Sequence, residues 1–186
     1  MSVDDRSTLY EGRLTLRAEE GDAPGQKAVA REWLAFLEAE AARAPTLRAR
    51  VSLGMNLVSA ALTLEAPERV LPLLQRNERE LPHDEAPPRH LSMLYQAMQR
   101  ADDALAAIDR ALHNKAAGRV RVQLLTSRAE LLHARGDRAA AVSALEEALR
   151  VARALPQKLN MDRQVTLLEQ QLTELKSAPP ASPARG

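Results

Sequence analysis

The chain has 186 residues, with 26 Lys and Arg against 25 Asp and Glu and a formal net charge of +1. These charges are interspersed, so no dominant field would collect nucleic acid or an anionic membrane, and neither is expected as a partner. The chain has no cysteine and 2% aromatic residues, which excludes disulfides, thiolate zinc sites and thiol nucleophiles and leaves Ala and Leu to pack the core.

The start of the chain, Met1 to Ser7, lacks the basic residues and the apolar stretch of a secretory signal. Arg or Glu interrupts every Ala/Leu run, so no stretch reaches the roughly 18 consecutive apolar residues that a membrane-spanning helix needs. Together with the absence of cysteine, these features predict a cytoplasmic protein.

Apolar residues recur with the 3.6-residue period of a helix between breaks rich in Gly and Pro, and this pattern predicts an all-α protein. Helices are predicted over residues 7–19, 26–43, 47–63, 67–81, 87–99, 101–113, 118–135, 138–154 and 157–176. Residues 177–186 are rich in proline and have no apolar period, so we expect a disordered tail there.

Three short segments of the chain are similar to one another. They are Glu65–Val70, Gln99–Ala104 and Gly136–Ala141, and each opens an Ala/Leu-rich helix. Treating Val70, Ala104 and Ala141 as equivalent gives offsets of 34 and 37 residues. A period of this length is typical of stacked helical hairpins, in which each unit buries its apolar face against its neighbours.

The repeated residues resemble the tetratricopeptide repeat (TPR) family. The third unit carries the resemblance with Ala129, Leu132, Gly136, Asp137, Ala141, Leu145, Ala148 and Pro156, and the second with Ser92, Tyr95, Gln99, Ala104, Ile108 and Ala111. The first is looser, with Val58, Ala61, Glu65, Val70, Leu74, Asn77 and Pro82, and a degenerate earlier unit has Gly21, Asp22, Ala30, Leu34 and Leu37. The resemblance implies a right-handed α-solenoid of three to four hairpins.

The resemblance divides the chain into parts of one helical domain over residues 1–176. These are a degenerate first unit at 7–45, repeats at 51–84, 85–121 and 122–156, and a capping helix at 157–176. The last helix places Val165, Leu168, Leu172 and Leu175 on one stripe, which predicts that it covers the exposed face of the last repeat.

Two segments, Glu32–Glu40 and Arg100–Ala107, also look like the helical repeat region that follows a thioredoxin-like domain in some bacterial proteins. No thioredoxin-like domain and no cysteine is present here, so no redox function is carried over.

In TPR proteins the first helices of the hairpins line a concave groove, and the resemblance therefore implies a set of groove residues. They are Met55, Asn56, Ser59, Arg89, His90, Met93, Gln96, Gln123, Thr126, Ser127, Glu130 and His133. Such mixed polar side chains and two methionines suit a peptide or a partner helix, so we expect a scaffold that binds a protein or peptide partner. The alternative is that these residues form an ordinary solvated face.

One TPR subtype binds the C-terminal carboxylate of a partner with Lys, Asn and Arg. The matching positions hold Met55, Ser59, His90, Gln123 and Ser127, which supply no cation, so this subtype is rejected.

No catalytic signature is present, and we expect neither catalytic residues nor a cofactor. Histidines stand at 83, 90, 113 and 133, without an HExxH motif or an i, i+4 pair, so no metal site is predicted. Arg119 and Arg121 flank Val120 and are expected to be solvated. The chain is therefore not expected to be an enzyme.

A competing hypothesis is a self-assembling protein. The homodimer would form either through the stripe of the C-terminal helix or through an exposed patch of Trp33 and Phe36. Packing in the core is the other interpretation of Trp33.

Overall fold

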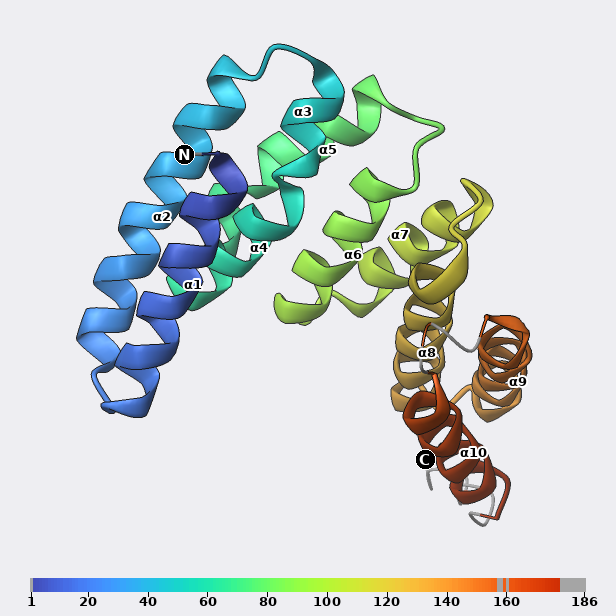
Figure 1. Cartoon of the computed structure of the whole chain (residues 1–186). Coiled ribbons are helices and arrows are strands. Elements are labelled where there is room, and N and C mark those ends of the chain that lie inside the picture. The colour runs from blue at the N-terminus through green and yellow to red at the C-terminus, as the bar shows by residue number, and fades with distance from the viewer. Residues whose placement is uncertain (1, 157–158, 160, 178–186) are drawn as a thin grey trace, which may run out of the picture. The chain divides into compact units, whose positions relative to one another are not determined.

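The computed structural model describes residues 2–156, 159 and 161–177 (Figure 1). Every regular element in this part of the chain is a helix, which confirms the all-α prediction. None of the helices described is long and apolar enough to cross a membrane. The chain divides into two compact units, which we call the N-unit (Met1–Ala107) and the C-unit (Ile108–Gly186), and α7 (Ala101–His113) contributes residues to both.

Helix α1 (Val3–Glu19) begins four residues before the predicted start at residue 7. Ser2 caps it: the Asp5 amide donates to Ser2 Oγ at 3.0 Å, and the Ser2 amide donates to Asp5 Oδ2 at 2.9 Å. These two bonds lower the pKa of the Asp5 carboxyl, because they favour its charged form. The reciprocal cap satisfies two amides that have no partner within the helix, which explains the early start.

Helix α2 (Ala23–Arg43) packs against α1 and holds Trp33 in the core. The indole is 0% exposed, its Nε1–H donates to Ser7 Oγ at 3.3 Å, and its ring centroid lies 6.3 Å from that of Tyr10. Trp33 is therefore part of the packing between α1 and α2. The exposed patch of Trp33 and Phe36 proposed for a homodimer is wrong, since α1 covers the indole.

The helix predicted at 47–63 is broken at Leu53 into α3 (Leu47–Ser52) and α4 (Gly54–Thr63). A Cβ atom built on Gly54 would lie 2.1 Å from Nδ1 of His90 on α6 (Ala86–Ala97). Glycine is thus needed at this position because the imidazole occupies the space where any other side chain would begin. The contact comes from a distant part of the chain, and no local pattern indicated it.

The helix predicted at 67–81 is also divided, into the short 3₁₀-helix η1 (Pro67–Arg69) and α5 (Leu71–Glu80). Pro72 lies in the first turn of α5, where its missing amide hydrogen costs no helical bond. Asn77, where a small residue was expected, is 0% exposed, and its Oδ1 accepts from Nε of Arg50 on α3 at 2.7 Å. The larger residue therefore ties α5 to α3.

Within the N-unit, α4 packs against both α2 and α6, and α5 packs against α3 and α6. A hydrogen bond links α5 to α6: the hydroxyl of Tyr95 on α6 accepts from Nε2 of Gln75 on α5 at 3.1 Å. The helices of this unit are thus joined by contacts between elements that are not adjacent in the chain.

The C-unit contains the end of α7, followed by α8 (Gly118–Ala134), α9 (Arg138–Ala154) and α10 (Asp162–Ser177). Helix α9 packs against both α8 and α10. Leu168 and Leu175 of α10 are 0% and 7% exposed, so the predicted stripe of the last helix is used within the chain. This stripe is not available for the homodimer proposed through it.

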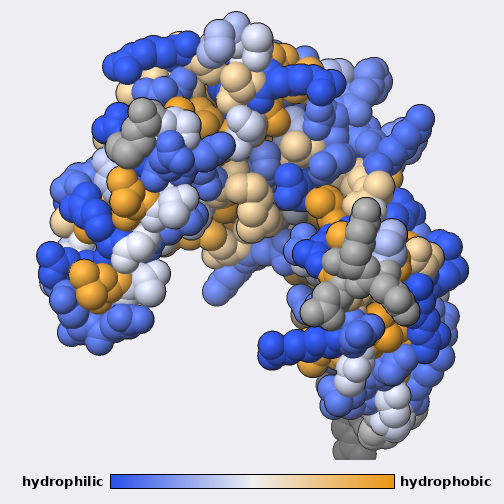
Figure 2. Space-filling model, in the orientation of Figure 1, coloured by the Kyte–Doolittle hydropathy of each residue, from blue (hydrophilic) through white to orange (hydrophobic). Residues whose placement is uncertain are grey.

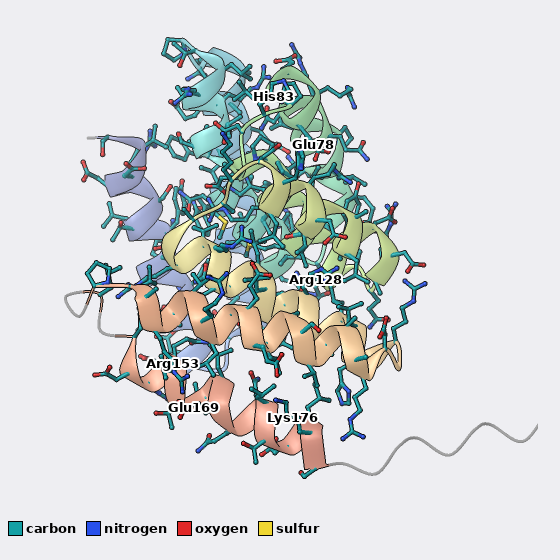
Figure 3. All side chains as sticks on the ribbon, turned by 90° about the vertical axis from the view of Figure 1, so that its right-hand side faces the viewer. Glu78, His83, Arg128, Arg153, Glu169 and Lys176 are labelled. Carbon is teal, nitrogen blue, oxygen red and sulfur yellow. The ribbon has the colours of Figure 1, made fainter. Side chains whose placement is uncertain are left out.

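Ion pairs flank the contact between α9 and α10. Arg153 Nη2 lies 2.6 Å from Glu169 Oε1, and Lys176 Nζ lies 2.7 Å from Glu146 Oε1 (Figure 3). The predicted helix start at 157 and most of the predicted tail at 177–186 lie outside the described residues, and Ser177 is the last residue of α10.

Four helix ends share one turn geometry. Gly21, Glu65, Gln99 and Gly136 have φ angles of 68°, 59°, 58° and 87°, in the left-handed region. In each, the amide of this residue donates to the carbonyl three residues back, and the next amide donates to the carbonyl five residues back. This is the Schellman motif that closes a helix. Lys115, at the end of α7, has the same geometry.

Residues at equivalent distances after three of these turns are buried in the same way. Val70, Ala104 and Ala141 are 1%, 0% and 0% exposed. The apolar residues four positions later, Leu74, Ile108 and Leu145, are buried as well. The stripe predicted from the spacing therefore faces the core of the unit in which each residue lies.

Candidate partner-binding cleft

The C-unit positions its surface residues through two well-defined helix ends. Gly136 ends the hairpin turn after α8, and the side chain of Asp137 accepts from the amide of Ala140 at 3.1 Å to cap α9. Helix α10 then lies on α9 through Leu168 and Leu175. This arrangement leaves the N-terminal half of α10 beside α8 with space between them.

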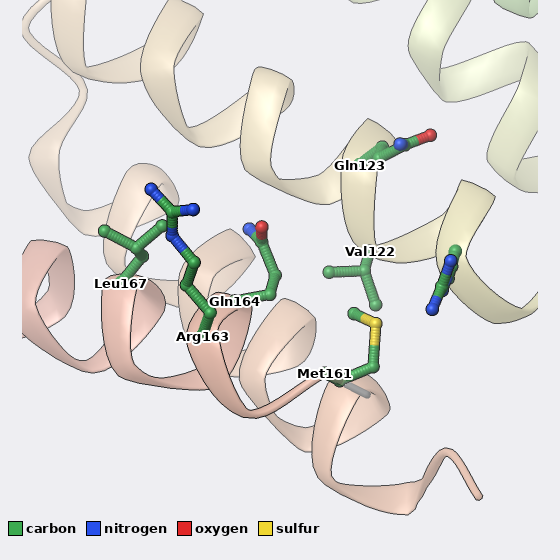
Figure 4. A pocket seen from close by; sticks show the side chains of 7 residues that line it. Val122, Gln123, Met161, Arg163, Gln164 and Leu167 are labelled. Atoms are coloured by element: carbon green, nitrogen blue, oxygen red, sulfur yellow. The ribbon is translucent and has the colours of Figure 1, made fainter. Parts of the chain in front are cut away.

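An open cleft of about 460 Å³ occupies this space (Figure 4). Among the described residues, its lining combines arginines, glutamines and apolar side chains: Arg119, Val122 and Gln123 on α8, and Met161, Arg163, Gln164 and Leu167 at the start of α10. The volume falls within the range of about 300–1,000 Å³ that small-ligand pockets span. The cleft is large enough for one or two side chains of a partner.

The apolar part of the cleft is only partly covered. Val122 is 1% exposed and forms the floor, Met161 is half-buried, and Figure 4 shows these two side chains pointing toward one another. Leu167 is 44% exposed although it lies one residue from the fully buried Leu168. An apolar side chain placed here would remove Leu167 from water, which is favourable.

The ionisable side chains described in the lining are both arginines. Arg119 Nη2 donates to the carbonyl of Leu159, which fixes the guanidinium at one end of the cleft. Arg163 is exposed and takes part in no hydrogen bond or ion pair among the residues that the structure describes. Since Gln123 and Gln164 offer both amide donors and acceptors, the cleft can bind a peptide backbone and a carboxylate together.

A smaller pocket of about 130 Å³ lies further along α8. It is lined by Ala129, Glu130, His133, Leu145, Gln171 and Leu175. Its apolar residues belong to the packing of α8, α9 and α10, whereas Glu130 and His133 are exposed at its edge. Both pockets therefore lie along the side of α8 that faces α10.

The predicted groove residues of α8 divide between these two pockets. Gln123 lines the larger pocket, and Glu130 and His133 line the smaller one. Thr126 is half-buried, its hydroxyl donates to the carbonyl of Val122 at 2.9 Å, and Ser127 is half-buried as well. In this unit the predicted groove residues lie on the side of α8 that lines the two pockets, and the prediction did not include α10.

His90, predicted to lie in the groove of the second repeat, is 2% exposed, so it cannot contact a partner directly. Its ring packs against the backbone of Gly54. The pKa of His90 is lowered to about 4, mainly by burial and also by the charge of the neighbouring Arg89, while Asp84 partly opposes the change. The imidazole is therefore a neutral core residue at physiological pH.

The other predicted groove residues of the N-unit have mixed environments. Met93 and Ser59 are exposed, and Met55 and Asn56 are half-buried. Arg89 is half-buried, with its Nε 3.2 Å from Glu85 Oε2, and Gln96 donates to the carbonyl of Ser92 at 3.2 Å. Arg89 and Gln96 thus already have partners in α6 or in the residue that caps it, which reduces their value as contacts for another protein.

Five residues of the cleft were not predicted as groove residues: Arg119, Met161, Arg163, Gln164 and Leu167. Arg119 and Arg121 were expected to be solvated. Arg119 is exposed and also donates to the carbonyl of Leu159, whereas Arg121 is half-buried and pairs with Glu147. The sequence did contain an indication that Leu167 could be exposed, because this apolar residue lies next to the predicted apolar stripe of its helix and not on it.

The described residues contain no group of three or more His, Cys, Asp or Glu side chains that could hold a metal ion. No protein-family model matches the chain, and neither does any curated protein or any solved structure.

Proposed function

We propose that this chain is a non-enzymatic, cytoplasmic protein interaction module, built of TPR-like helical hairpins, that binds a segment of a partner protein. The repeated turn geometry at Glu65, Gln99 and Gly136, with a buried residue at the same place in the following helix, supports this architecture. Helical hairpins of this kind mostly present surfaces to partners, which makes binding the class of function that the fold favours.

The open cleft between α8 and α10 is the observation that carries the proposal. It is the place in the C-unit where an exposed leucine, an arginine with no described partner and glutamine side chains converge. A rigid site of this kind loses little conformational entropy when it binds, because packed helices already hold its residues.

The lining indicates the chemistry of the partner segment. One Leu, Met or Phe side chain of the partner would pack between Leu167, Met161 and Val122. An acidic residue close to it would meet Arg163, and the partner's backbone would exchange hydrogen bonds with the glutamines. The partner is therefore a peptide or helix that carries a large apolar residue next to Asp or Glu.

Selection of peptides from a random display library against the full chain tests this proposal. We expect enrichment of sequences with Leu, Met or Phe within four residues of Asp or Glu. An R163E variant should lose affinity for these peptides by about tenfold or more, since a charge-assisted contact is worth about 1.5–3 kcal/mol and the substitution also introduces repulsion. The same variant should instead select peptides with Lys or Arg.

L9E on α1 is the matched control, because it places the same acidic charge on an exposed site of the N-unit, far from the cleft in sequence. It should bind the selected peptides as the original chain does. The proposal fails if the library yields no enriched peptide, or if R163E and L9E bind the enriched peptides equally well.

A further inference from the structure

The two pockets beside α8 are separated by about two helical turns. Gln123 lines the larger pocket, and Glu130, seven residues further along α8, lines the smaller one. On α10 the same interval of seven residues separates Gln164 in the larger pocket from Gln171 in the smaller one. Since seven residues make about two turns, the side chains that line both pockets lie on one side of each helix.

The pockets follow one another in the same order on both helices. The larger one is lined by the N-terminal parts of α8 and α10, and the smaller one by their C-terminal parts. The two helices therefore run in the same direction, and at 1.5 Å per residue the pockets are about 10.5 Å apart along them. One continuous segment of a partner can thus contact both pockets.

This distance favours a helical partner over an extended one. Residues i and i+7 of a helix are about 10.5 Å apart and lie on the same side. In an extended strand, which rises about 3.3 Å per residue, the distance corresponds to about three residues, and side chains three residues apart point to opposite faces. A helix can therefore fill both pockets, whereas an extended segment fills one of them.

The smaller pocket suits one aliphatic side chain. Its volume of about 130 Å³ is close to the roughly 150 Å³ of an apolar cavity that holds a benzene molecule. Ala129, Leu145 and Leu175 form its buried part. Apolar groups on the C-unit are scattered among mainly hydrophilic residues (Figure 2), so affinity there depends on individual pockets and not on a wide apolar surface.

The two pockets carry opposite charges. Arg119 and Arg163 line the larger pocket, and Glu130 is the carboxylate described in the lining of the smaller one. Glu130 is exposed and forms no hydrogen bond or ion pair within the part of the chain that the structure describes. A basic residue of the partner would pair with Glu130, just as an acidic residue would pair with Arg163.

We propose that the partner segment is an amphipathic α-helix with two large apolar residues seven positions apart, one beside Asp or Glu and the other beside Lys or Arg. The first apolar residue fills the larger pocket, with its acidic neighbour at Arg163, and the second fills the smaller pocket, with its basic neighbour at Glu130. This inference rests on the function proposed for the larger cleft, to which it adds the conformation of the partner and a second contact.

Fluorescence polarisation of labelled synthetic peptides with the full chain tests the helical partner. A two-anchor peptide of about 18 residues, rich in alanine so that it forms a helix, carries a Leu-Glu pair and a Leu-Lys pair whose leucines are seven residues apart. A single-anchor peptide has alanine in place of the Leu-Lys pair. The two-anchor peptide should bind at least tenfold more tightly, because it buries a second leucine.

Two altered peptides test the spacing and the conformation. In one, the Leu-Lys pair is moved two residues closer to the Leu-Glu pair, which turns it to another side of the helix. In the other, a proline between the two pairs breaks the helix. Both should bind no more tightly than the single-anchor peptide.

E130R tests the contact at the smaller pocket. It should weaken binding of the two-anchor peptide about fivefold or more and leave the single-anchor peptide unaffected. A two-anchor peptide with Glu in place of Lys should bind E130R more tightly than it binds the original chain. E11R, which makes the same change at an exposed site of α1 in the N-unit, is the matched control and should bind every peptide normally. Circular dichroism establishes that both variants keep their helices.

The outcomes separate this proposal from the function of the larger cleft. The helical partner is wrong if either altered peptide binds as tightly as the two-anchor peptide, or if E130R leaves the affinity of the two-anchor peptide unchanged. The larger cleft keeps its proposed function in that case if R163E still weakens the single-anchor peptide. Both proposals are wrong if no peptide binds at about 1 mM. A mass in solution above 20.4 kDa that returns to this value in E130R would identify a second copy as the occupant and overturn the proposal.

Discussion

Two glycines inside helices of the N-unit have opposite surroundings. Gly54 begins α4 and is pressed against His90 of α6, so that a Cβ atom would lie 2.1 Å from Nδ1. Gly12 lies in the middle of α1, and a Cβ atom there would meet nothing within 4 Å. Both residues interrupt a helical pattern in the sequence, but only the first has a cause inside its unit.

The difference separates a glycine that the packing of the unit requires from one that this packing does not require. At the contact of α4 with α6, removing glycine would create a clash in a buried region. In the middle of α1, replacing Gly12 should raise the free energy of unfolding of the isolated chain. The predictions below use this contrast between the α4–α6 contact and the exposed side of α1 that carries Gly12 and Leu16.

Leucine truncation should produce the largest difference between the two regions. Leu91 of α6 is 0% exposed, and L91A should lower the free energy of unfolding by about 2–5 kcal/mol through lost burial and the cavity left behind. L16A on α1 should change it by less than about 0.5 kcal/mol, as for an exposed side chain. Urea unfolding of the two variants at low protein concentration measures both values. Similar effects for both would contradict the comparison.

Acidification should weaken the α4–α6 contact through His90. Its pKa of about 4 in the folded chain lies below the value of 6.5 for an exposed imidazole, so the unfolded chain binds a proton first. This stabilisation is complete above pH 6.5 and is lost as the pH falls toward 4, by an amount on the order of 3 kcal/mol.

Unfolding free energies measured from pH 7 to pH 4 test the His90 prediction. H90Q is the control, because it removes the titrating group and should abolish this part of the pH dependence. The carboxylates that also titrate remain in both proteins, and their contribution cancels in the comparison. A His90 imidazole that titrates near pH 6.5 in NMR spectra would disprove the buried, neutral state.

G54A should be moderately destabilising. The added methyl group must displace the imidazole of His90, and overpacking of this kind costs about 1–3 kcal/mol. Thermal unfolding should show a clearly lower midpoint than that of the original chain. A G54A variant of unchanged stability would mean that His90 can move away freely.

G12A should have the smallest effect and the opposite sign. Alanine is favoured over glycine in a helix interior by about 0.5–1 kcal/mol, and no atom of the surrounding unit obstructs it. The thermal midpoint should therefore rise by a few degrees. A lower midpoint would indicate that α1 is packed more closely than its exposure implies.

Local patterns were sufficient to predict where most helices lie. The predicted ranges 101–113 and 138–154 coincide with α7 and α9, because turn residues next to them mark both ends. The breaks at Leu53 and Val70 were missed. The break at Leu53 lies next to Gly54, which contacts α6, a helix distant in the chain. The break at Val70 lies just before α5, which has Pro72 in its first turn.

The candidate site was predicted only in part. Carrying over groove positions selected Gln123, Glu130 and His133, which line the pockets beside α8, since helical periodicity determines which residues share a side. It also selected His90, which is buried, because periodicity does not reveal which neighbouring helix will cover a face. The half of the cleft on α10 depends on how that helix packs on α9.

The amino-acid sequence by itself determined the helical class, the repeated turns and the buried stripe, because these depend on the spacing of apolar residues and on residues close together in the chain. Only the tertiary structure decided which apolar residues are covered. Trp33 and His90 are buried by α1 and α4, whereas Leu9, Leu16 and Leu167 stay in contact with water. The physical reason is that a side chain is buried by residues from distant parts of the chain. The local spacing of apolar residues does not specify which distant residues those will be.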